Sequence, residues 1–163
     1  MRERRNPKDV QDIDPLHEAA ITCSLPAALE AMGERWSFLI LRGAFNGLRH
    51  FEQFQGTLGI ARNILANRLA RLVSHGILAR APCADDRRKV EYRLTEKGEA
   101  LLPTLVALRQ WGDRWSGRAR GRGMLVDARD GRPLAPIEVR AADGRTLGLH
   151  DLRWMEPGAA ERG

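Results

Sequence analysis

One stretch constrains the fold of this chain more than any other: residues 59–80, GIARNILANRLARLVSHGILAR. It contains four arginines and no acid, and no Asp or Glu occurs between Glu52 and Asp85. The spacing predicts a helix over Ala61–His75 that ends at Gly76. One face of this helix is apolar, with Ile64, Leu65, Leu69, Leu72 and Val73. Such a helix packs on a core along one side and leaves an acid-free surface along the other.

The opposite face of this helix is small, polar and basic. Asn63, Asn67, Ala70 and Ser74 lie there, with Arg71 beside them and Arg62 in the first turn. Arg and Asn side chains form hydrogen bonds with base edges in the DNA major groove, where phosphates would repel acids. A face of this composition is also common on helices that are merely solvated. The helix alone therefore leaves both interpretations open.

The segments after this helix favour a DNA-binding fold. Ile77–Arg80 and Val90–Leu94 are predicted strands, and the loop between them ends in three consecutive cations, Arg87, Arg88 and Lys89. A winged helix-turn-helix has this order of elements: a helix, a turn, a polar helix and a hairpin with a basic tip. Its hairpin reaches the flanking DNA backbone or minor groove. We therefore expect a mainly α fold with a β-hairpin wing (α+β).

Three helices are predicted before the basic helix. The first, SLPAALEAMG, begins at Ser24 as N-cap and ends at Gly33. The second, RWSFLILRGAFNG, has a buried apolar side and ends at an Asn-Gly turn. The third, HFEQFQGTLG, is short, and we expect Gly56 and Gly59 to bracket the tight turn that leads into the basic helix.

The last long helix, TEKGEALLPTLVALRQWGDRW, carries an apolar strip. Thr95 is its expected N-cap, and Pro103 should bend or interrupt it. The strip consists of Leu101, Leu105, Leu108, Trp111 and Trp115. Together with the first helix it suggests a dimer seam, although it can also pack on its own domain.

The two ends of the chain differ from its middle. We interpret residues 1–22 as an N-terminal arm, 23–116 as the DNA-binding and dimerisation domain, and 117–163 as a basic linker with a small β-hairpin extension. Within the extension, VDARDGRPL and VRAADGRTL agree at six of nine positions, and each holds an Asp-Gly turn.

Composition limits the class of protein. The net charge is +6 and the pI is near 10.3, which favours polyanionic partners. The sequence contains no long apolar run and no secretory signal, so a cytoplasmic protein without a membrane partner is expected. The histidines and the two cysteines lack metal-ligand spacing, and no cofactor motif or activated nucleophile is present. We expect no metal, no cofactor and no enzymatic activity.

The combined motifs resemble a known family. The block from CSLPAALEAMG to LVSHGILAR, followed by VEYRLTEKGEALLP and RQWGDRW, is similar to the HxlR-type transcriptional regulators of bacteria from about Cys23 to Trp115. The resemblance implies a homodimer formed by the first and last helices, and a wing at Ala81–Lys89. It also places Cys23 at a cysteine that senses oxidants or electrophiles in some members. The wing departs from the family, because CADDRRK lacks the usual aromatic residue and prolines.

These observations predict a transcription regulator, more specifically a repressor, that reads a pseudo-palindromic operator in double-stranded DNA as a homodimer. Groove contacts are assigned to Arg62, Asn63, Asn67 and Arg71. Arg68 is assigned a phosphate or structural role, and phosphate contacts are assigned to Arg49, His50, Arg87, Arg88 and Lys89. The expected dimer residues are Leu25, Leu29, Leu105, Leu108, Trp111 and Trp115.

Two alternatives stay open at this stage. A winged-helix module that binds only protein would carry the same basic face as a solvated surface. The effector, if there is one, is a small molecule or a thiol-reactive compound. Cys23 is the candidate redox sensor, but a small buried hydrophobe would also suit its position.

Overall fold

The computed structural model describes three stretches of the chain, residues 23–83, 86–116 and 125–153. Three predicted segments lie wholly or partly outside the described residues. They are the N-terminal arm (1–22), most of the linker (117–123) and the wing, of which Ala84 and Asp85 are not described.

The described residues form two compact units. The larger unit runs from residue 28 to residue 137, and the smaller one combines residues 23–27 with residues 138–153. The larger unit holds the predicted basic helix and wing.

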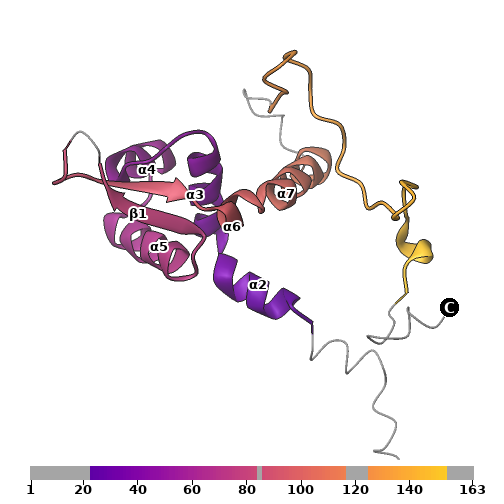
Figure 1. Ribbon diagram of the computed structural model, residues 1–163, viewed down its shortest axis with the longest axis horizontal. Coiled ribbons are helices and arrows are strands. Elements are labelled where there is room, and N and C mark those ends of the chain that lie inside the picture. The colour runs from indigo at the N-terminus through magenta and orange to yellow at the C-terminus, as the bar shows by residue number, and fades with distance from the viewer. Residues whose placement is uncertain (1–22, 84–85, 117–124, 154–163) are drawn as a thin grey trace, which may run out of the picture. The chain divides into compact units, whose positions relative to one another are not determined.

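In the described residues four helices precede the hairpin, and they match the four predicted ones (Figure 1). They are α2 (Leu25–Met32), α3 (Arg35–Phe45), α4 (Phe51–Leu58) and α5 (Arg62–Ser74). Gly33 ends α2 in a left-handed conformation, with φ of 74°, and its amide donates to the Leu29 carbonyl. Gly56 was expected to begin the turn before α5, but it lies inside α4. The turn therefore begins at Gly59.

The wing is an antiparallel pair of strands. β1 (Leu78–Pro82) pairs with β2 (Val90–Leu94), with Leu78 opposite Leu94 and Pro82 opposite Val90. β2 has the predicted bounds, whereas β1 lies one residue later than predicted at its start and two at its end. A short third segment joins the pair: the Tyr92 amide donates to the Arg49 carbonyl at 2.7 Å, and His50 forms a bridge with Glu91.

The last helical region is interrupted, as Pro103 predicted. α6 (Glu96–Glu99) is followed by α7 (Leu102–Trp115), in which Pro103 is the second residue. A proline is tolerated there because the amides of the first turn have no partner within the helix. Thr95 caps α6 as expected, since its hydroxyl accepts from the Gly98 amide at 3.1 Å.

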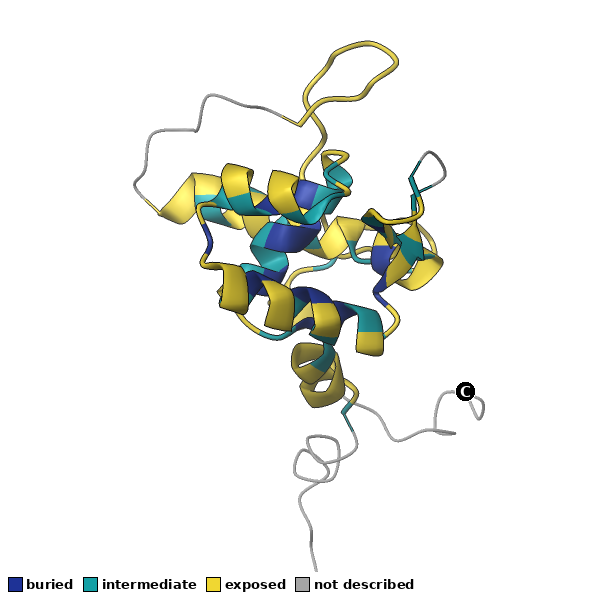
Figure 2. Ribbon diagram, turned by 90° about the vertical axis from the view of Figure 1, so that its left-hand side faces the viewer, coloured by how far each residue is buried: buried dark blue, intermediate teal, exposed yellow. Residues whose placement is uncertain are grey.

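The core lies between α3, α4, α5 and the hairpin. Figure 2 shows the buried residues on the inner sides of these elements and exposed residues on their outer sides. The fully or almost fully buried cluster consists of Ile40, Leu41, Phe54, Ile60, Leu65, Leu69, Leu72, Ile77 and Leu78. Three of these leucines belong to α5, which is therefore fixed on one side and open on the other.

The two repeats of the extension form tight turns. Each turn is closed by one antiparallel bridge, Val126 with Pro133 in the first and Arg140 with Thr146 in the second. The described part of the extension contains no longer ladder, so the predicted hairpin element is reduced to these turns. A short 3-10 helix, η1 (Leu149–Asp151), follows the second turn.

Candidate nucleic-acid interface

A three-residue turn sets the angle between α4 and α5. Gly59 ends α4 with φ of 60° and donates its amide to the Gln55 carbonyl at 3.0 Å. Nothing lies within 4 Å of the position of a Cβ there, so the left-handed backbone, not space, makes glycine the favoured residue. Ile60 then inserts its side chain into the core, which locks the turn.

The outer face of α5 presents the predicted polar residues to solvent. Arg62, Asn63 and Asn67 are all exposed, together with Ala66 and Ala70 between them. The Arg62 guanidinium lies 4.9 Å from the centre of the Phe51 ring, a cation–π contact that holds it beside the start of α4. This face combines hydrogen-bonding side chains with small residues that permit close approach.

Arg68 and Arg71 bind other groups of the chain, and the Arg68 guanidinium donates to the Asn67 Oδ1 atom at 3.0 Å. Arg68 forms an ion pair with Glu34, and Arg71 donates to the Glu30 carbonyl oxygen. Both side chains are half-buried, and within the described residues their Nε atoms are buried without an acceptor. Arg68 therefore ties α5 to the turn between α2 and α3, and Arg71 ties α5 to α2 itself.

The sequence offered no clue to these partners. Glu30 and Glu34 lie 34 or more positions before the arginines that they contact, and only packing brings them together. Gly33 lies between them, and a Cβ there would be 3.1 Å from the Ser37 hydroxyl and 3.7 Å from the Arg71 Nε atom. The structure thus places Arg71 at a helix junction and not on the face formed by Asn63 and Asn67.

The wing presents its three cations to solvent. Arg87, Arg88 and Lys89 are exposed. Asp86 accepts from the Arg88 amide at 3.0 Å and from its guanidinium at 3.1 Å, and these bonds hold the pKa of the Asp86 carboxyl below its usual range. The Cys83 amide also donates to the Lys89 carbonyl at 2.9 Å. These bonds shape the wing tip where the family's prolines are missing.

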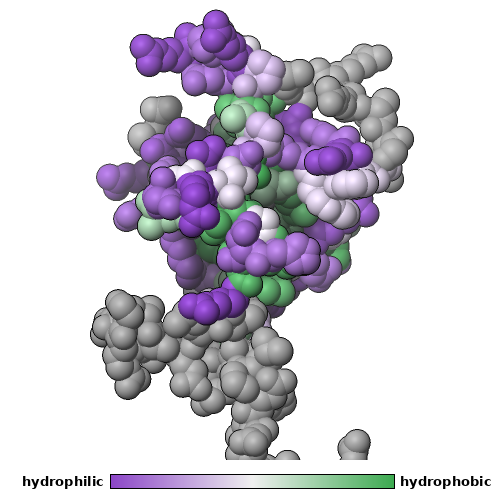
Figure 3. Space-filling view, turned by 90° about the vertical axis from the view of Figure 1, so that its right-hand side faces the viewer, coloured by the Kyte–Doolittle hydropathy of each residue, from purple (hydrophilic) through white to green (hydrophobic). Residues whose placement is uncertain are grey.

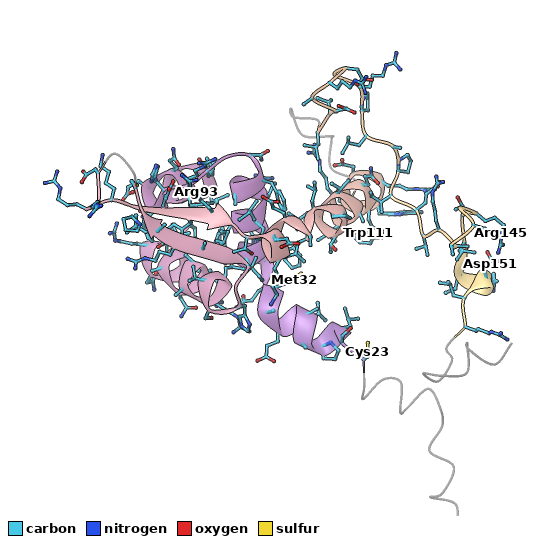
Figure 4. All side chains as sticks on the ribbon, viewed as in Figure 1. Cys23, Met32, Arg93, Trp111, Arg145 and Asp151 are labelled. Carbon is cyan, nitrogen blue, oxygen red and sulfur yellow. The ribbon has the colours of Figure 1, made fainter. Side chains whose placement is uncertain are left out.

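Arg49 and His50 join the wing to the start of α4. The Arg49 side chain is exposed, whereas His50 is half-buried with its Nδ1 atom 3.2 Å from the Val90 carbonyl oxygen. Opposite His50, the buried Glu91 binds Arg93 at 2.7 Å; Arg93 is labelled in Figure 4. The Arg93 hydrogen bond, reinforced by the positive charges of Arg93, Arg49 and His50, lowers the pKa of the Glu91 carboxyl. The one acid of β2 is therefore neutralised locally.

Two side chains of the TEKG segment hold the C-terminal end of α5, a role that the sequence does not reveal. Lys97 donates to the His75 carbonyl at 2.8 Å, and the Thr95 hydroxyl donates to the Gly76 carbonyl at 2.6 Å. A cation and a hydroxyl donor satisfy carbonyls that the helix leaves unpaired. The TEKG segment therefore supports the orientation of α5.

The two cysteines lie in different units. Cys23 precedes α2, and its Sγ atom accepts from the Leu25 amide at 3.4 Å; Figure 4 labels it. Cys83 lies in the wing, with its Sγ atom 3.9 Å from the His50 Nδ1 atom. Both are free and half-buried.

The described part of the chain contains neither a cluster of metal-ligating side chains nor a helix suited to cross a membrane. No three His, Cys, Asp or Glu side chains converge there as metal ligands would. Nor does any helix in that part have the length and apolarity that a membrane crossing requires.

A family model described as HxlR-like helix-turn-helix matches residues 31–120, which is more than half of the chain. The chain belongs to this HxlR family. The family consists of transcriptional regulators and not of enzymes, and its fold is the winged helix-turn-helix formed here by α3–α5 and the hairpin.

Individual HxlR relatives support this assignment. The HTH-type transcriptional regulator Rv3095 of Mycobacterium tuberculosis is 48% identical over 98 residues, which cover 60% of this chain and 62% of Rv3095. The crystal structure of PA1607 is 42% identical with a TM-score of 0.78, covering 86% of this chain and 99% of PA1607. The oxidized form of the redox regulator HypR is 28% identical with a TM-score of 0.52, covering 60% of this chain and 99% of HypR.

Proposed function

We propose that this chain is a DNA-binding transcription regulator that represses its targets by occupying a pseudo-palindromic operator as a homodimer. The observation that carries the proposal is the exposed, acid-free face of α5. Arg62, Asn63 and Asn67 project from it, and the wing cations are exposed on the neighbouring hairpin. In a winged helix-turn-helix these two elements contact the major groove and the flanking backbone.

The proposal divides the basic residues by role. Arg62, Asn63 and Asn67 contact base edges, and Arg49, Arg87, Arg88 and Lys89 contact phosphates. Arg68 and Arg71 position α5, because their guanidinium groups already bind the α2–α3 turn and α2, respectively. His50 supports the wing through its bridge to Glu91 and contributes less to DNA than its neighbour Arg49.

The homodimer follows from exposed apolar side chains on two helices. Leu25 and Leu29 of α2 are at least half exposed, and so are Leu108, Trp111 and Trp115 of α7. Large apolar groups grouped on a helix favour a protein contact over solvent. Leu105, by contrast, is half-buried against the core of its own subunit, so we assign it a smaller share of the seam. A twofold dimer presents two copies of α5 to half-sites about one helical turn apart.

Selection of DNA from a random pool tests the base contacts. We expect Asn67→Ala to relax the preference at one base position in each half-site and to cost about 1–3 kcal/mol of binding free energy. Arg71→Ala should weaken binding to all sequences and lower the thermal stability, because it removes the bond between α5 and the Glu30 carbonyl of α2. Selected sequences and Kd values for each variant measure both effects.

The matched control is Lys89→Ala in the wing. Losing one phosphate contact should weaken all sequences alike and make the slope of log Kd against log salt concentration shallower by about 1. Unchanged selectivity in Asn67→Ala would show that this face of α5 does not read bases. A chain that binds random duplex no better than a neutral protein would indicate a module for protein contact instead.

We also propose that Cys23 senses a thiol-reactive effector. HypR is described as a redox regulator, and Cys23 lies directly before α2, which we place in the dimer seam. Modification of its Sγ atom would remove the acceptor of the Leu25 amide and shift the start of α2.

Gel shifts before and after a mild oxidant test the sensor. The unmodified chain should change its operator Kd, and Cys23→Ser should not. Cys83→Ser is the control and should respond like the unmodified chain. Equal operator binding before and after the oxidant in the unmodified chain would exclude a thiol switch.

A further inference from the structure

The exposed apolar side chains are confined to a few segments of the described chain. All large apolar residues that are exposed there belong to α2, to α7 or to the extension, whereas the helix-turn-helix and the wing contribute none. Figure 3 shows apolar side chains reaching the surface between polar ones. This distribution separates a DNA-contacting part of the chain from a part that is suited to bind protein.

A groove runs between α7 and the first part of the extension. It encloses about 970 Å³, and its apolar lining includes Val106, Trp111, Trp115, Leu125, Leu134 and Ile137. Gln110 fixes the extension beside α7: its amide nitrogen donates to the Ala135 carbonyl at 2.9 Å, and its amide oxygen accepts from the Ile137 amide at 2.8 Å. Two hydrogen bonds of Gln110 thus hold the extension beside α7, and the described side chains leave the groove between them open.

The extension has defined turns but no core. In the first turn Asp127 accepts from the Arg129 amide at 2.7 Å, and in the second Asp143 accepts from the Arg145 amide at 3.1 Å. Among residues 125–153, only Ala141 and Leu147 are even half-buried, and Leu149 is 82% exposed. Ordering a chain costs conformational entropy that apolar burial must offset. A second molecule that covers this segment would supply the burial that offsets this cost.

The charges of the extension argue against DNA as that molecule. Residues 125–153 contain as many arginines as acids, in contrast to the basic chain as a whole. Several of these arginines are paired within the segment, for example Arg140 with Glu138 at 3.0 Å and Arg145 with Asp143 at 2.8 Å. A neutral, internally paired surface gains little from phosphates, and it does not repel a second copy of itself.

The occupant favoured by these observations is a second copy of this chain. We infer that residues 125–152 form an intersubunit arm whose apolar side chains, with the groove along α7, are covered by the α7 and arm of the partner. The groove shares Trp111 and Trp115 with the strip already proposed for the dimer, so the two surfaces are continuous. In a twofold dimer both arms meet the same seam. This inference rests on the homodimer proposed above.

The structural match to PA1607 extends into the intersubunit arm. It covers 86% of this chain, whereas residues 1–120 make up fewer than three quarters of it. The matched part must therefore include residues of the extension, although the family model ends at residue 120. PA1607 and this chain share an element that the family model lacks.

Sedimentation equilibrium on the full chain tests the arm. Leu134→Asp combined with Ile137→Asp places two charges per copy in the groove, and the dimer dissociation constant should rise at least about tenfold. Ala128→Asp adds a charge to the same arm at an exposed turn and should leave the constant within about threefold. Circular dichroism checks that the helical core of each variant is folded, since neither Leu134 nor Ile137 belongs to it.

A second measurement uses the unmodified chain and so avoids any effect of substitution on folding. In dimers mixed from one copy with 13C-labelled leucine methyls and one unlabelled copy, isotope-filtered NOEs should link Leu149 or Leu152 to the partner. A dimer without such NOEs, or an unchanged dissociation constant in the double variant, would overturn the arm. If Leu108→Glu splits the dimer but the arm variant does not, the proposed dimer stands and only the arm fails. A chain that is monomeric at micromolar concentration would instead overturn the dimer.

Discussion

Gly98→Ala should destabilise the winged-helix core by about 3 kcal/mol, a large fraction of the stability of a typical domain. A Cβ at Gly98 would lie 2.3 Å from the Ile77 carbonyl oxygen, a backbone atom that cannot rotate away. That oxygen also accepts from the Thr95 amide and the Thr95 hydroxyl. Relieving the clash means moving α6 off the start of β1 and breaking these bonds. The change in free energy of unfolding can be measured with urea at fixed protein concentration.

The same prediction has consequences for function. The segment that carries Gly98 also caps α5, through Lys97 at His75 and Thr95 at Gly76. A displaced α6 should therefore weaken DNA binding even at temperatures at which Gly98→Ala stays folded.

Gly56→Ala is the matched control. Gly56 lies inside α4 without a positive φ, and nothing lies within 4 Å of the position of its Cβ. Alanine is favoured over glycine in a helix, so this variant should be more stable by about 0.5–1 kcal/mol. If Gly98→Ala unfolds at the same urea concentration as the unmodified chain, the close approach of α6 to Ile77 is not present in the protein.

The sequence predicted the elements whose boundaries depend on local chemistry. Gly33 and Thr95 mark helix ends because a left-handed residue and a side-chain cap act within a few residues. β2 was located correctly because Val90–Leu94 alternates in a way that only a half-buried strand explains. Gly56 was misjudged because α4 has enough other helix-compatible residues to continue through a glycine.

Contacts between distant residues could not be predicted in this way. The sequence predicts a groove contact for Arg71 because a helical wheel shows the direction of a side chain but not what packs beside it. The Glu30 carbonyl that it binds comes from another helix. His50, for which the sequence predicts a phosphate contact, is half-buried and forms a backbone bridge with Glu91. The exposed residues Asn63 and Asn67, which no neighbouring element covers, were located correctly on the open face of α5.

The second large effect concerns Leu108, which lies on α7 with half of its surface exposed and outside the core. Leu108→Glu places a charge in each copy of the proposed seam, where the two carboxylates face an apolar surface. We expect dissociation into folded monomers at micromolar concentration, because burying unpaired charge costs more than such a contact gains. Light scattering measures the mass, and circular dichroism measures the retained helix content.

Splitting the dimer should also lower operator affinity at least about hundredfold. A dimer binds its second half-site as an intramolecular step, and that advantage commonly amounts to two to four orders of magnitude. Leu108→Met, which keeps an apolar side chain of similar volume, should remain dimeric and bind normally. Leu105→Glu should behave differently from Leu108→Glu and unfold the subunit, because Leu105 packs against the core. A Leu108→Glu protein that stays dimeric, or a monomer that binds a single half-site as tightly as the unmodified chain binds the full operator, would contradict the role of α7 in presenting two copies of α5 to DNA.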